Sequence, residues 1–404
     1  MGDLKRIGVL TGGGDCPGMN AVIRTVTREA CRAGAEVVGV LDGFLGLIET
    51  PARTRTLTPA DVRGLLSVGG TVLGTSNRAD PFHFAVPTVP QVGVPQVGRS
   101  GPTCADAHET PGQPVMTDVS DRCLAALAAL RLDALIIAGG DGTMTIAAEL
   151  EKRLSTQHSA LSTRILGIPK TIDNDLCGTA LSFGFLTAVS IATEALDRVR
   201  TTAASHHRVM AVEVMGRNSG WIALHAGVAG GADAILIPEI PFDFGPLVEA
   251  IRQRKAAGKH HSVLCIAEGA RPAGGGKIVA RVDPTSPDPI RLGGVGRFVA
   301  EEIEKRAGIE SRYVVLGHTQ RGGPPVPEDR ILGTLFAHHA LKLAAAGASG
   351  RMVAMKSLAA GAAGLTDVPL SEAAGKQRLV PVGKSEEHPL VEAARAVGTC
   401  FGDT

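Results

Sequence analysis

Residues Asp133–Thr143 read DALIIAGGDGT, which predicts a buried parallel strand, a glycine-rich turn and the start of a helix. The run Ala134–Ala138 is apolar throughout, like strands that helices cover on both faces of an open α/β sheet. Glycines in the turn let the backbone approach an anion closely, because N–H groups at a helix N-terminus favour negative charge. Asp141 is then placed to hold a divalent cation that neutralises such an anion. A plain strand-to-helix turn without a ligand is the alternative.

A second stretch, Ile168–Asp175 (IPKTIDND), follows the next predicted strand. Thr171, Asp173 and Asp175 alternate along it, so an extended backbone would project all three side chains in one direction. A hydroxyl group beside two carboxylates suits the removal of a proton next to a metal-bound phosphate. The alternative is an Asx-turn loop with a structural role. Together, the two stretches favour phosphoryl transfer.

Several other predicted strands end in turns that carry charged groups, and open α/β sheets bind ligands beyond the carboxyl ends of their strands. The first turn, Thr11–Asn20, lacks the Gly-Lys-Ser/Thr ending of a P-loop and the spacing of a dinucleotide-binding fingerprint, but it remains a candidate phosphate cradle. The others are Gly69–Arg78, Met215–Trp221, Glu268–Gly269 and Gly317–Pro324. A cluster of His and Arg residues, Ser205–Arg208, is a further candidate anion site where a helix ends and the next strand begins. There are more charged turns than one small anion would require. Their number indicates a reaction between two phosphorylated molecules.

The composition argues against two classes of partner. The 404 residues include 41 Lys plus Arg and 40 Asp plus Glu, so no overall basic charge favours nucleic acid or an anionic membrane. Aromatic residues make up only 3%, which disfavours base-stacking platforms. No window approaches the roughly 20 consecutive apolar residues of a membrane span. The seven cysteines lack paired metal-ligand spacing and suit a reducing compartment, so we expect a cytoplasmic protein.

Residues 80–117 read as an irregular insertion rich in proline and glycine, which includes the tandem pentapeptides 89–93 and 94–98. Repeated prolines exclude a regular helix from this segment. A loop of this length beside a predicted nucleotide site is either a lid or a surface insertion.

On its motifs, the chain closely resembles the 6-phosphofructokinases of the bacterial type. Five motifs occur in the family's order: Leu10–Asn20 (LTGGGDCPGMN), Gly139–Thr143 (GGDGT), Pro169–Asp175 (PKTIDND), Val214–Arg217 (VMGR) and Leu316–Gly323 (LGHTQRGG). The resemblance implies an α/β fold of two Rossmann-like, three-layer lobes with mainly parallel sheets and an active site in the cleft between them. Residues 1–183 with 320–370 would form the lobe that binds ATP, and residues 184–319 with 371–404 the lobe that binds fructose 6-phosphate.

The resemblance also implies the reaction, which is transfer of a phosphoryl group from ATP with Mg²⁺ to the 1-hydroxyl group of fructose 6-phosphate. Asp173 matches the catalytic base, with Thr171 and Asp175 beside it and Arg217 also among the catalytic positions. Asp141 matches the carboxylate that organises the metal. The other residues that match the donor site are Gly13, Arg78, Gly140, Gly142, Thr143 and Lys170. The residues that match contacts to the sugar phosphate are Thr171, Asp173, Arg208, Met215, Gly216, Arg217, Glu268, Arg312, His318 and Arg321.

Two further expectations come from the same resemblance. Arg208 and Arg312 match arginines that reach the 6-phosphate from a neighbouring subunit, which implies a homotetramer or a dimer. Arg24, Arg28, Arg200 and Lys259 match, the last less closely, an allosteric nucleotide pocket, so ADP or phosphoenolpyruvate would be the effector. The four residues could equally be solvated surface charge.

The identity of the donor depends on two positions that disagree. At position 142 this chain has glycine and in this respect resembles the ATP-using members of the family. Pyrophosphate-using members have an aspartate there, which would clash with the α-phosphate of a nucleotide. Lys170 stands where pyrophosphate-using members also have lysine, whose ammonium group can pair with a phosphate. We weigh the steric effect more heavily and expect ATP. The alternatives are a pyrophosphate-dependent phosphotransferase and a non-catalytic homologue that senses a sugar phosphate. NAD and lipid kinases share GGDGT but lack the other motifs.

Overall fold

The computed structural model describes residues 4–86, 115–157, 162–282, 290–357, 364–383 and 386–403. Within these residues the larger sheet contains β1 (Arg6–Thr11), β2 (Glu36–Val40), β3 (Thr54–Leu57), β6 (Ala134–Gly139), β7 (Arg164–Thr171), β8 (Phe183–Gly184), β15 (Arg351–Met355) and β16 (Leu365–Pro369). Its order is β16-β15-β7-β6-β1-β2-β3, and β8 pairs with β7. Only β3 and β16 pair antiparallel to their neighbours. This mainly parallel sheet confirms the predicted fold class.

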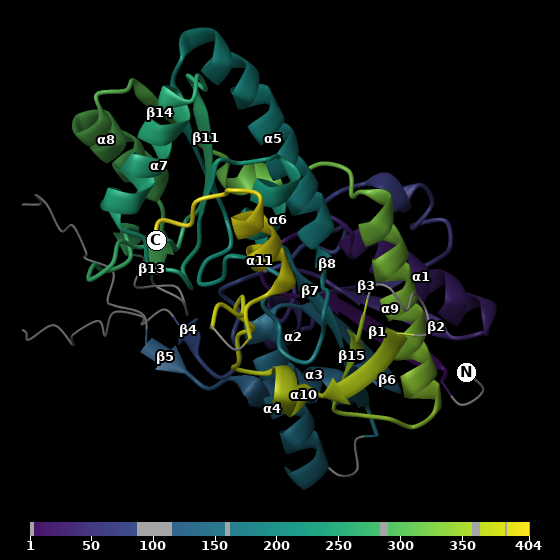
Figure 1. Cartoon of the computed structure of the whole chain (residues 1–404). Helices are drawn as coiled ribbons and strands as arrows, with labels where there is room; N and C mark the ends of the chain where they lie inside the picture. Colours follow the sequence, from purple (N-terminus) through teal and green to yellow (C-terminus); the bar gives the residue numbers. More distant parts are fainter. Residues whose placement is uncertain are drawn as a thin grey trace, which may run out of the picture.

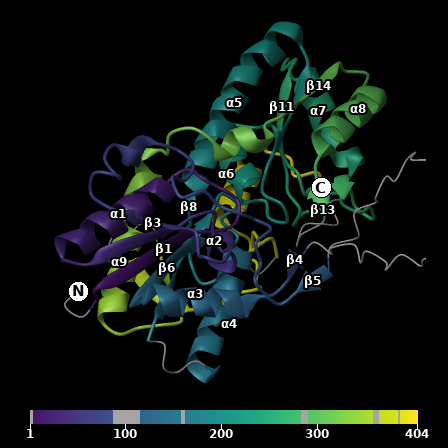
Figure 2. The same ribbon diagram turned by 180° about the vertical axis from the view of Figure 1, so that it is seen from behind.

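Helices cover both faces of the larger sheet. The helices α1 (Met19–Arg32) and α9 (Pro327–Ala345) lie side by side on one face (Figures 1 and 2). The other face carries α2 (Leu45–Ile48), α3 (Ser120–Leu130), α4 (Asp141–Gln157) and α10 (Leu370–Ala373). Along β6, Ile136 packs into the core shared with α1 and α9, whereas Ile137 packs into the core shared with α3 and α4. Because alternate residues face opposite layers, the whole strand is apolar.

The smaller sheet repeats this three-layer plan. It contains β9 (Val209–Val214), β10 (Ala234–Leu236), β11 (Ser262–Ala267) and β14 (Ser311–Val315), in the order β10-β11-β9-β14 and parallel throughout. The helices α5 (Phe185–His206) and α6 (Trp221–Ala229) cover one face, and α7 (Phe244–Ala256) and α8 (Val295–Ala307) cover the other. The core beneath α5 and α6 is continuous with the core beneath α1 and α9, so the two sheets belong to one packed molecule.

The remaining elements are short. They are β4 (Phe84–Val86), β5 (Val115–Thr117), β12 (Val279–Val282), β13 (Ile290–Leu292), the 3-10 helices η1 (Leu65–Ser67) and η2 (Gly317–Arg321), and α11 (Pro389–Ala396). β4 pairs antiparallel with β5, so the two ends of the predicted insertion are joined, while residues 87–114, with both pentapeptides, lie outside the described residues. Among the helices described, none is long and apolar enough to cross a membrane.

Candidate active site

Most of the predicted turns gather at the carboxyl edges of the two sheets, whereas Ser205–Arg208 precedes β9 and lies at the opposite end of the smaller sheet. β7, β6 and β1 are parallel neighbours, and the Thr171 loop, the Asp141 turn and the Gly12 turn follow them. In the smaller sheet, Glu268 follows β11 and Met215 follows β9. Since parallel strands end at the same edge, residues far apart in the sequence are brought together there.

The Gly12–Gly14 turn is a tight cradle. Gly13 has a φ of 77°, a left-handed conformation that glycine adopts without strain. A Cβ atom on Gly13 would lie 3.4 Å from Thr143 Oγ1 and 3.5 Å from Lys170 Nζ, so both polar groups face this turn. The loop before Arg78 closes the other side, because Thr75 Oγ1 donates to the Gly13 carbonyl at 2.6 Å. The structure therefore brings three of the predicted donor residues together, namely Gly13, Thr143 and Lys170.

Two cations lie beneath the cradle. Lys170 is only 3% exposed, and its ammonium group donates to the Gly14 carbonyl. Burial lowers the pKa of Lys170. Arg321, from η2, donates through Nη1 to the Asp15 carbonyl at 3.0 Å. His318, in the same turn, is exposed. The cradle therefore carries positive charge that a phosphate would neutralise.

Asp141 and Gly142 open helix α4. The Asp141 carboxylate accepts a hydrogen bond from the Gly375 N–H at 2.7 Å, and burial raises its pKa. A Cβ atom on Gly142 would have no neighbour within 4 Å. Gly142 lines a pocket of about 830 Å³ together with Thr145 and residues of α10. There is consequently free space beside Gly142, where the sequence predicts the nucleotide.

The loop after β7 differs from the extended backbone that the alternating residues suggested. Strand β7 ends at Thr171, whose Oγ1 accepts from the Asp173 N–H at 3.0 Å. Asn174 then takes a left-handed φ of 53°, a conformation that asparagine tolerates better than most residues. Its Oδ1 accepts from the Ser182 N–H at 3.0 Å. Side-chain hydrogen bonds, rather than strand geometry, therefore hold this loop.

The two carboxylates of this loop are both buried. Asp173 is 4% exposed and Asp175 is 6% exposed. Asp173 Oδ1 has no hydrogen-bond partner within the described part of the chain. Burial raises the pKa of Asp173, against the lowering effect of Arg321, Arg217 and Lys170. Burial and the neighbouring Asp173 charge raise the pKa of Asp175 to about 7. A carboxylate that is buried without a partner is costly unless a ligand contacts it.

Residues that follow β9 and β11 of the smaller sheet form the other side of the site. Gly216 and Arg217 follow β9 with φ values of 141° and 51°, and the second is strained for a residue with a side chain. The Arg217 N–H donates to Glu268 Oε1 at 3.0 Å, which fixes this turn. Burial raises the pKa of Glu268 to about 7. Ser219 Oγ donates to the Asp173 carbonyl at 3.2 Å, so this side of the site contacts the carboxylate loop directly.

Arg208 and Arg312 lie at the opposite end of the smaller sheet. They precede or begin β9 and β14, and both bind the Glu310 carboxylate, at 2.8 Å and 2.6 Å. Arg208 and Met215 are separated by the six residues of β9, which corresponds to roughly 20 Å at about 3.3 Å per residue. In a single chain the two arginines therefore lie away from the other predicted sugar-phosphate residues.

The predicted effector residues are spread over three parts of the fold. Arg24 and Arg28 lie on α1, Arg200 lies on α5, and Lys259 follows α7. Arg200 Nη2 donates to the carbonyls of Gly230 and Gly231, both at 2.7 Å, at the end of α6.

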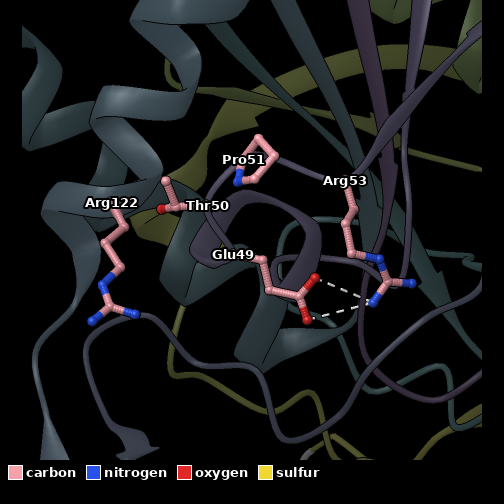
Figure 3. Close-up of a pocket in the computed structure, with 5 residues that line it drawn as sticks. All are labelled: Glu49, Thr50, Pro51, Arg53 and Arg122. Atoms are coloured by element: carbon pink, nitrogen blue, oxygen red, sulfur yellow. Dashed lines mark hydrogen bonds and ion pairs between the residues drawn. The ribbon is translucent and has the colours of Figure 1, made fainter.

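A further surface pocket, of about 750 Å³, contains none of the predicted site residues (Figure 3). Glu49, Thr50, Pro51, Arg53 and Arg122 line it. The Glu49 carboxylate is already paired with Arg53 at 3.3 Å, and Arg122 points away from that pair. This pocket therefore lacks the predicted phosphate-binding and carboxylate residues that lie at the carboxyl edges of the two sheets.

Sequence reasoning missed one part of the site, the segment Gly375–Val380. Its backbone contacts Asp141 and Asp175, and its arginine, Arg378, lies against Trp221. The segment carries no strand, helix or glycine-rich motif that would predict these contacts. They depend on the path of the chain between the two sheets, which local sequence does not encode.

Comparison with known proteins agrees with this architecture. The family model described as "Phosphofructokinase" matches residues 6–344. An ATP-dependent 6-phosphofructokinase of Chloroflexus aurantiacus is 45% identical and covers 99% of this chain and 98% of its own length. A pyrophosphate–fructose 6-phosphate 1-phosphotransferase of Amycolatopsis methanolica is 44% identical over 87% of this chain and 90% of its own. The crystal structure of Pichia pastoris phosphofructokinase in the T-state superposes with a TM-score of 0.70 and 28% identity, over 92% of this chain and 36% of that longer one.

Proposed function

Because the chain belongs to the phosphofructokinase family, we propose that it transfers the γ-phosphoryl group of ATP to the 1-hydroxyl group of fructose 6-phosphate. The product is fructose 1,6-bisphosphate. The observation that carries this proposal is the buried carboxylate of Asp173, whose Oδ1 lacks a partner among the described residues. It lies within the fields of Lys170, Arg321 and Arg217, at the carboxyl edges of both sheets.

Asp173 acts as the general base. Its free oxygen accepts the proton of the 1-hydroxyl group as the bond to phosphorus forms. The transition state of phosphoryl transfer is loose, so proton transfer can occur late and positioning and charge neutralisation account for most of the rate enhancement. Lys170 and Arg321 supply positive charge beside the Gly12–Gly14 cradle, where the donor phosphates would bind.

Mg²⁺ is the implied metal, and Asp141 would hold it. No group of three or more metal-ligating side chains occurs within the described ranges, which fits Mg²⁺ because this ion is usually bound by one or two carboxylates together with substrate phosphates. Bound there, the ion would neutralise charge on the donor phosphates. Asp141 is the first residue of α4, and its carboxylate accepts backbone hydrogen bonds from Gly375 and Lys376, which leave further oxygen lone pairs for a cation.

ATP is the donor because the space beside Gly142 is open. An aspartate side chain at this position would project into the pocket where a nucleotide would extend beyond its transferred phosphate. Lys170 is the opposing observation, since its ammonium group could bind a phosphate of pyrophosphate. That ammonium group already donates to the Gly14 carbonyl, so its position is explained by the cradle itself.

The two-lobe division follows the two sheets. We assign residues 1–183 with 320–370 to the donor lobe and residues 184–319 with 371–404 to the sugar-phosphate lobe, except that the rest of α10, residues 371–373, packs on α4 of the donor lobe. The strands of the larger sheet fall in the first set, apart from Gly184, and those of the smaller sheet fall in the second. The bridge of Cys400 to Ala234 supports the return of the C-terminal residues to the smaller sheet.

A homo-oligomer, a tetramer or a dimer, would complete the sugar-phosphate site. At about 3.3 Å per strand residue, Arg208 lies roughly 20 Å from the Met215 end of the sheet, and Arg312, which is opposite Met210, lies about 16 Å from it. The two arginines would therefore bind the 6-phosphate of a neighbour. Tyr313 and Val315, on the same strand as Arg312, are 46% and 50% exposed, as expected of residues that another subunit covers. Effector binding at Arg24, Arg28, Arg200 and Lys259 remains a prediction.

A coupled assay for fructose 1,6-bisphosphate tests the proposal, with Mg²⁺ and either ATP or pyrophosphate as the sole donor. We expect turnover with ATP. Asp173→Asn should lower kcat by about 10² to 10⁴, the usual contribution of a general base, with the KM for fructose 6-phosphate little changed. Asp197→Asn, at an exposed position on α5, is the matched control.

Three outcomes would count against the assignment. Turnover with neither donor would exclude the enzymatic function. Near-normal turnover of Asp173→Asn would remove this residue from its role as base, while turnover with pyrophosphate alone would show that Lys170 outweighs Gly142 in selecting the donor.

A further inference from the structure

The segment Gly375–Val380 crosses from one lobe to the other beside the active site. It begins after α10, which packs on α4 in the larger lobe, and leads to α11, which packs on α6 in the smaller lobe. Figure 1 shows this C-terminal part of the chain, in yellow, running from α10 to α11. We call residues 375–380 the strap.

Arg378 is the centre of the strap and contacts the carboxylate loop at three points. Its backbone N–H donates to the Asp175 carbonyl at 2.7 Å. Its guanidinium Nη2 donates to the carbonyls of Asn174 and Ala180, at 2.7 Å and 3.0 Å. These carbonyls lie on both sides of the loop, so one planar guanidinium group ties its beginning to its end.

The same arginine contacts the smaller lobe. Its guanidinium group lies over the indole ring of Trp221, 4.4 Å from the ring centroid, and the Trp221 Nε1–H donates to the Arg378 carbonyl at 2.9 Å. Trp221 begins α6, directly after the turn that carries Arg217 and Ser219. Arg378 is therefore in contact with both the carboxylate loop and the element that presents the sugar-phosphate residues.

The neighbouring strap residues add contacts of the same kind. Gly375 donates to the Asp141 carboxylate at 2.7 Å. Gln377 accepts from Asn218 Nδ2 at 3.2 Å, and a backbone bridge joins it to Leu176. The Val380 N–H and the Gly220 N–H both donate to Glu239 Oε1 at 2.9 Å. The strap thus contacts the Asp141 carboxylate, the loop that carries Asp173 and Asp175, and the N-terminus of α6.

We propose that the strap holds the two halves of the active site in register, and that Arg378 is the positioning residue that sets Asp173 against Arg217 and the substrate hydroxyl group. This inference rests on the proposed phosphoryl transfer. The loop needs such support because its buried carboxylates repel each other and its backbone is irregular. Arg378 touches no reacting atom, so it acts only through the position of the loop.

The test combines kinetics with the fluorescence of Trp221, the one tryptophan in the sequence. In Arg378→Ala we expect kcat to fall by about tenfold to a hundredfold, the effect of a small misplacement of catalytic groups, while the KM values for ATP and fructose 6-phosphate stay close to wild type. The Trp221 emission should shift to longer wavelength, because its ring loses its cover. Millimolar guanidinium chloride, but not sodium chloride, should restore part of the lost kcat.

Arg395→Ala is the matched control. Arg395 also lies over an aromatic ring, Phe401, at 4.8 Å, but its ion pairs are with Glu387 and Asp403 in the C-terminal segment. This variant should keep wild-type kcat and Trp221 emission. If Arg378→Ala does not fold, Arg378→Lys replaces it, and it should retain the fold and lose kcat because one ammonium group cannot reproduce the planar fork.

Three results would overturn the inference. One is a wild-type kcat in Arg378→Ala or Arg378→Lys. Another is a loss of kcat that guanidinium does not relieve more than sodium chloride does. The third is an unchanged Trp221 emission in the variant that folds. A wild-type protein without phosphofructokinase activity would refute the proposed function instead, and the emission shift would still test whether Arg378 covers Trp221.

Discussion

At the scale of single residues, the fold buries Asp175 and thereby disfavours the charged form of its carboxyl group. Its pKa of about 7 lies above the ordinary value of 3.8, so the folded protein binds the proton more tightly than the unfolded chain does. The tighter proton binding by Asp175 adds to the free energy of unfolding. This contribution is fully present below pH 3.8 and is lost as the pH rises from there through about 7. Near neutral pH the charged carboxylate therefore destabilises the fold.

We therefore predict that Asp175→Asn stabilises the protein in a pH-dependent way. At pH 8 the melting temperature should rise by about 2 °C, and at pH 5 the rise should be smaller because the wild-type side chain is then protonated. Thermal unfolding followed by circular dichroism at both pH values measures this. An exposed replacement, Asp197→Asn, should show no such difference. A larger stabilisation at pH 5 than at pH 8 would contradict the sign of the shift.

Gly142 offers a second prediction at this scale. A Cβ atom fits there without contact, so Gly142→Asp should fold, and its carboxylate should clash with the α-phosphate of a nucleotide, which pyrophosphate lacks. We expect kcat/KM for ATP to fall by about tenfold or more, the equivalent of about 1.4 kcal/mol, with a smaller loss of any pyrophosphate activity. Gly142→Ala controls for the added bulk and should stay near wild type. An equal loss with both donors would show that steric selection is not the mechanism.

Sequence reasoning succeeded for residues whose positions depend on the ends of strands. Gly13, Thr143 and Lys170 follow or end β1, β6 and β7, so the parallel sheet alone brings them together. It failed for Arg378, because the contacts of this residue with Asn174 and Trp221 depend on tertiary packing between separate lobes. An arginine in an irregular segment gives no periodic signal from which such a contact could be inferred.

At the scale of elements, the apolar pattern predicted the strands but not every backbone path. The continuous apolar run of β6 correctly indicated a strand covered on both faces. The alternation of Thr171, Asp173 and Asp175 indicated an extended loop that projects all three side chains in one direction, whereas a left-handed Asn174 turns the chain after β7 ends at Thr171. Local side-chain hydrogen bonds competed with the extended conformation here, as short polar side chains often do.

At the scale of the whole molecule, neither lobe is formed by a single continuous segment. Strands β15 and β16 return to the larger sheet after the chain has built the smaller one, and Cys400 pairs with Ala234 of the smaller sheet. The chain therefore crosses between the lobes repeatedly, and one apolar core joins them. Composition and periodicity cannot reveal such crossings. The expected division came from the family resemblance, and the sheet membership supports it.

The position of Arg312 leads to a prediction about the assembly. If each site takes its own Arg217 and a neighbour's Arg312, then Arg217→Ala and Arg312→Ala should each be nearly inactive alone. Co-expressed in equal amounts with different affinity tags, they should form mixed oligomers in which about a quarter of the sites combine an intact Arg217 with an intact neighbouring Arg312. Activity of the doubly purified mixture should approach that fraction of wild type or exceed it. Mixed oligomers no more active than the separate variants would show that Arg312 serves its own chain or no site at all.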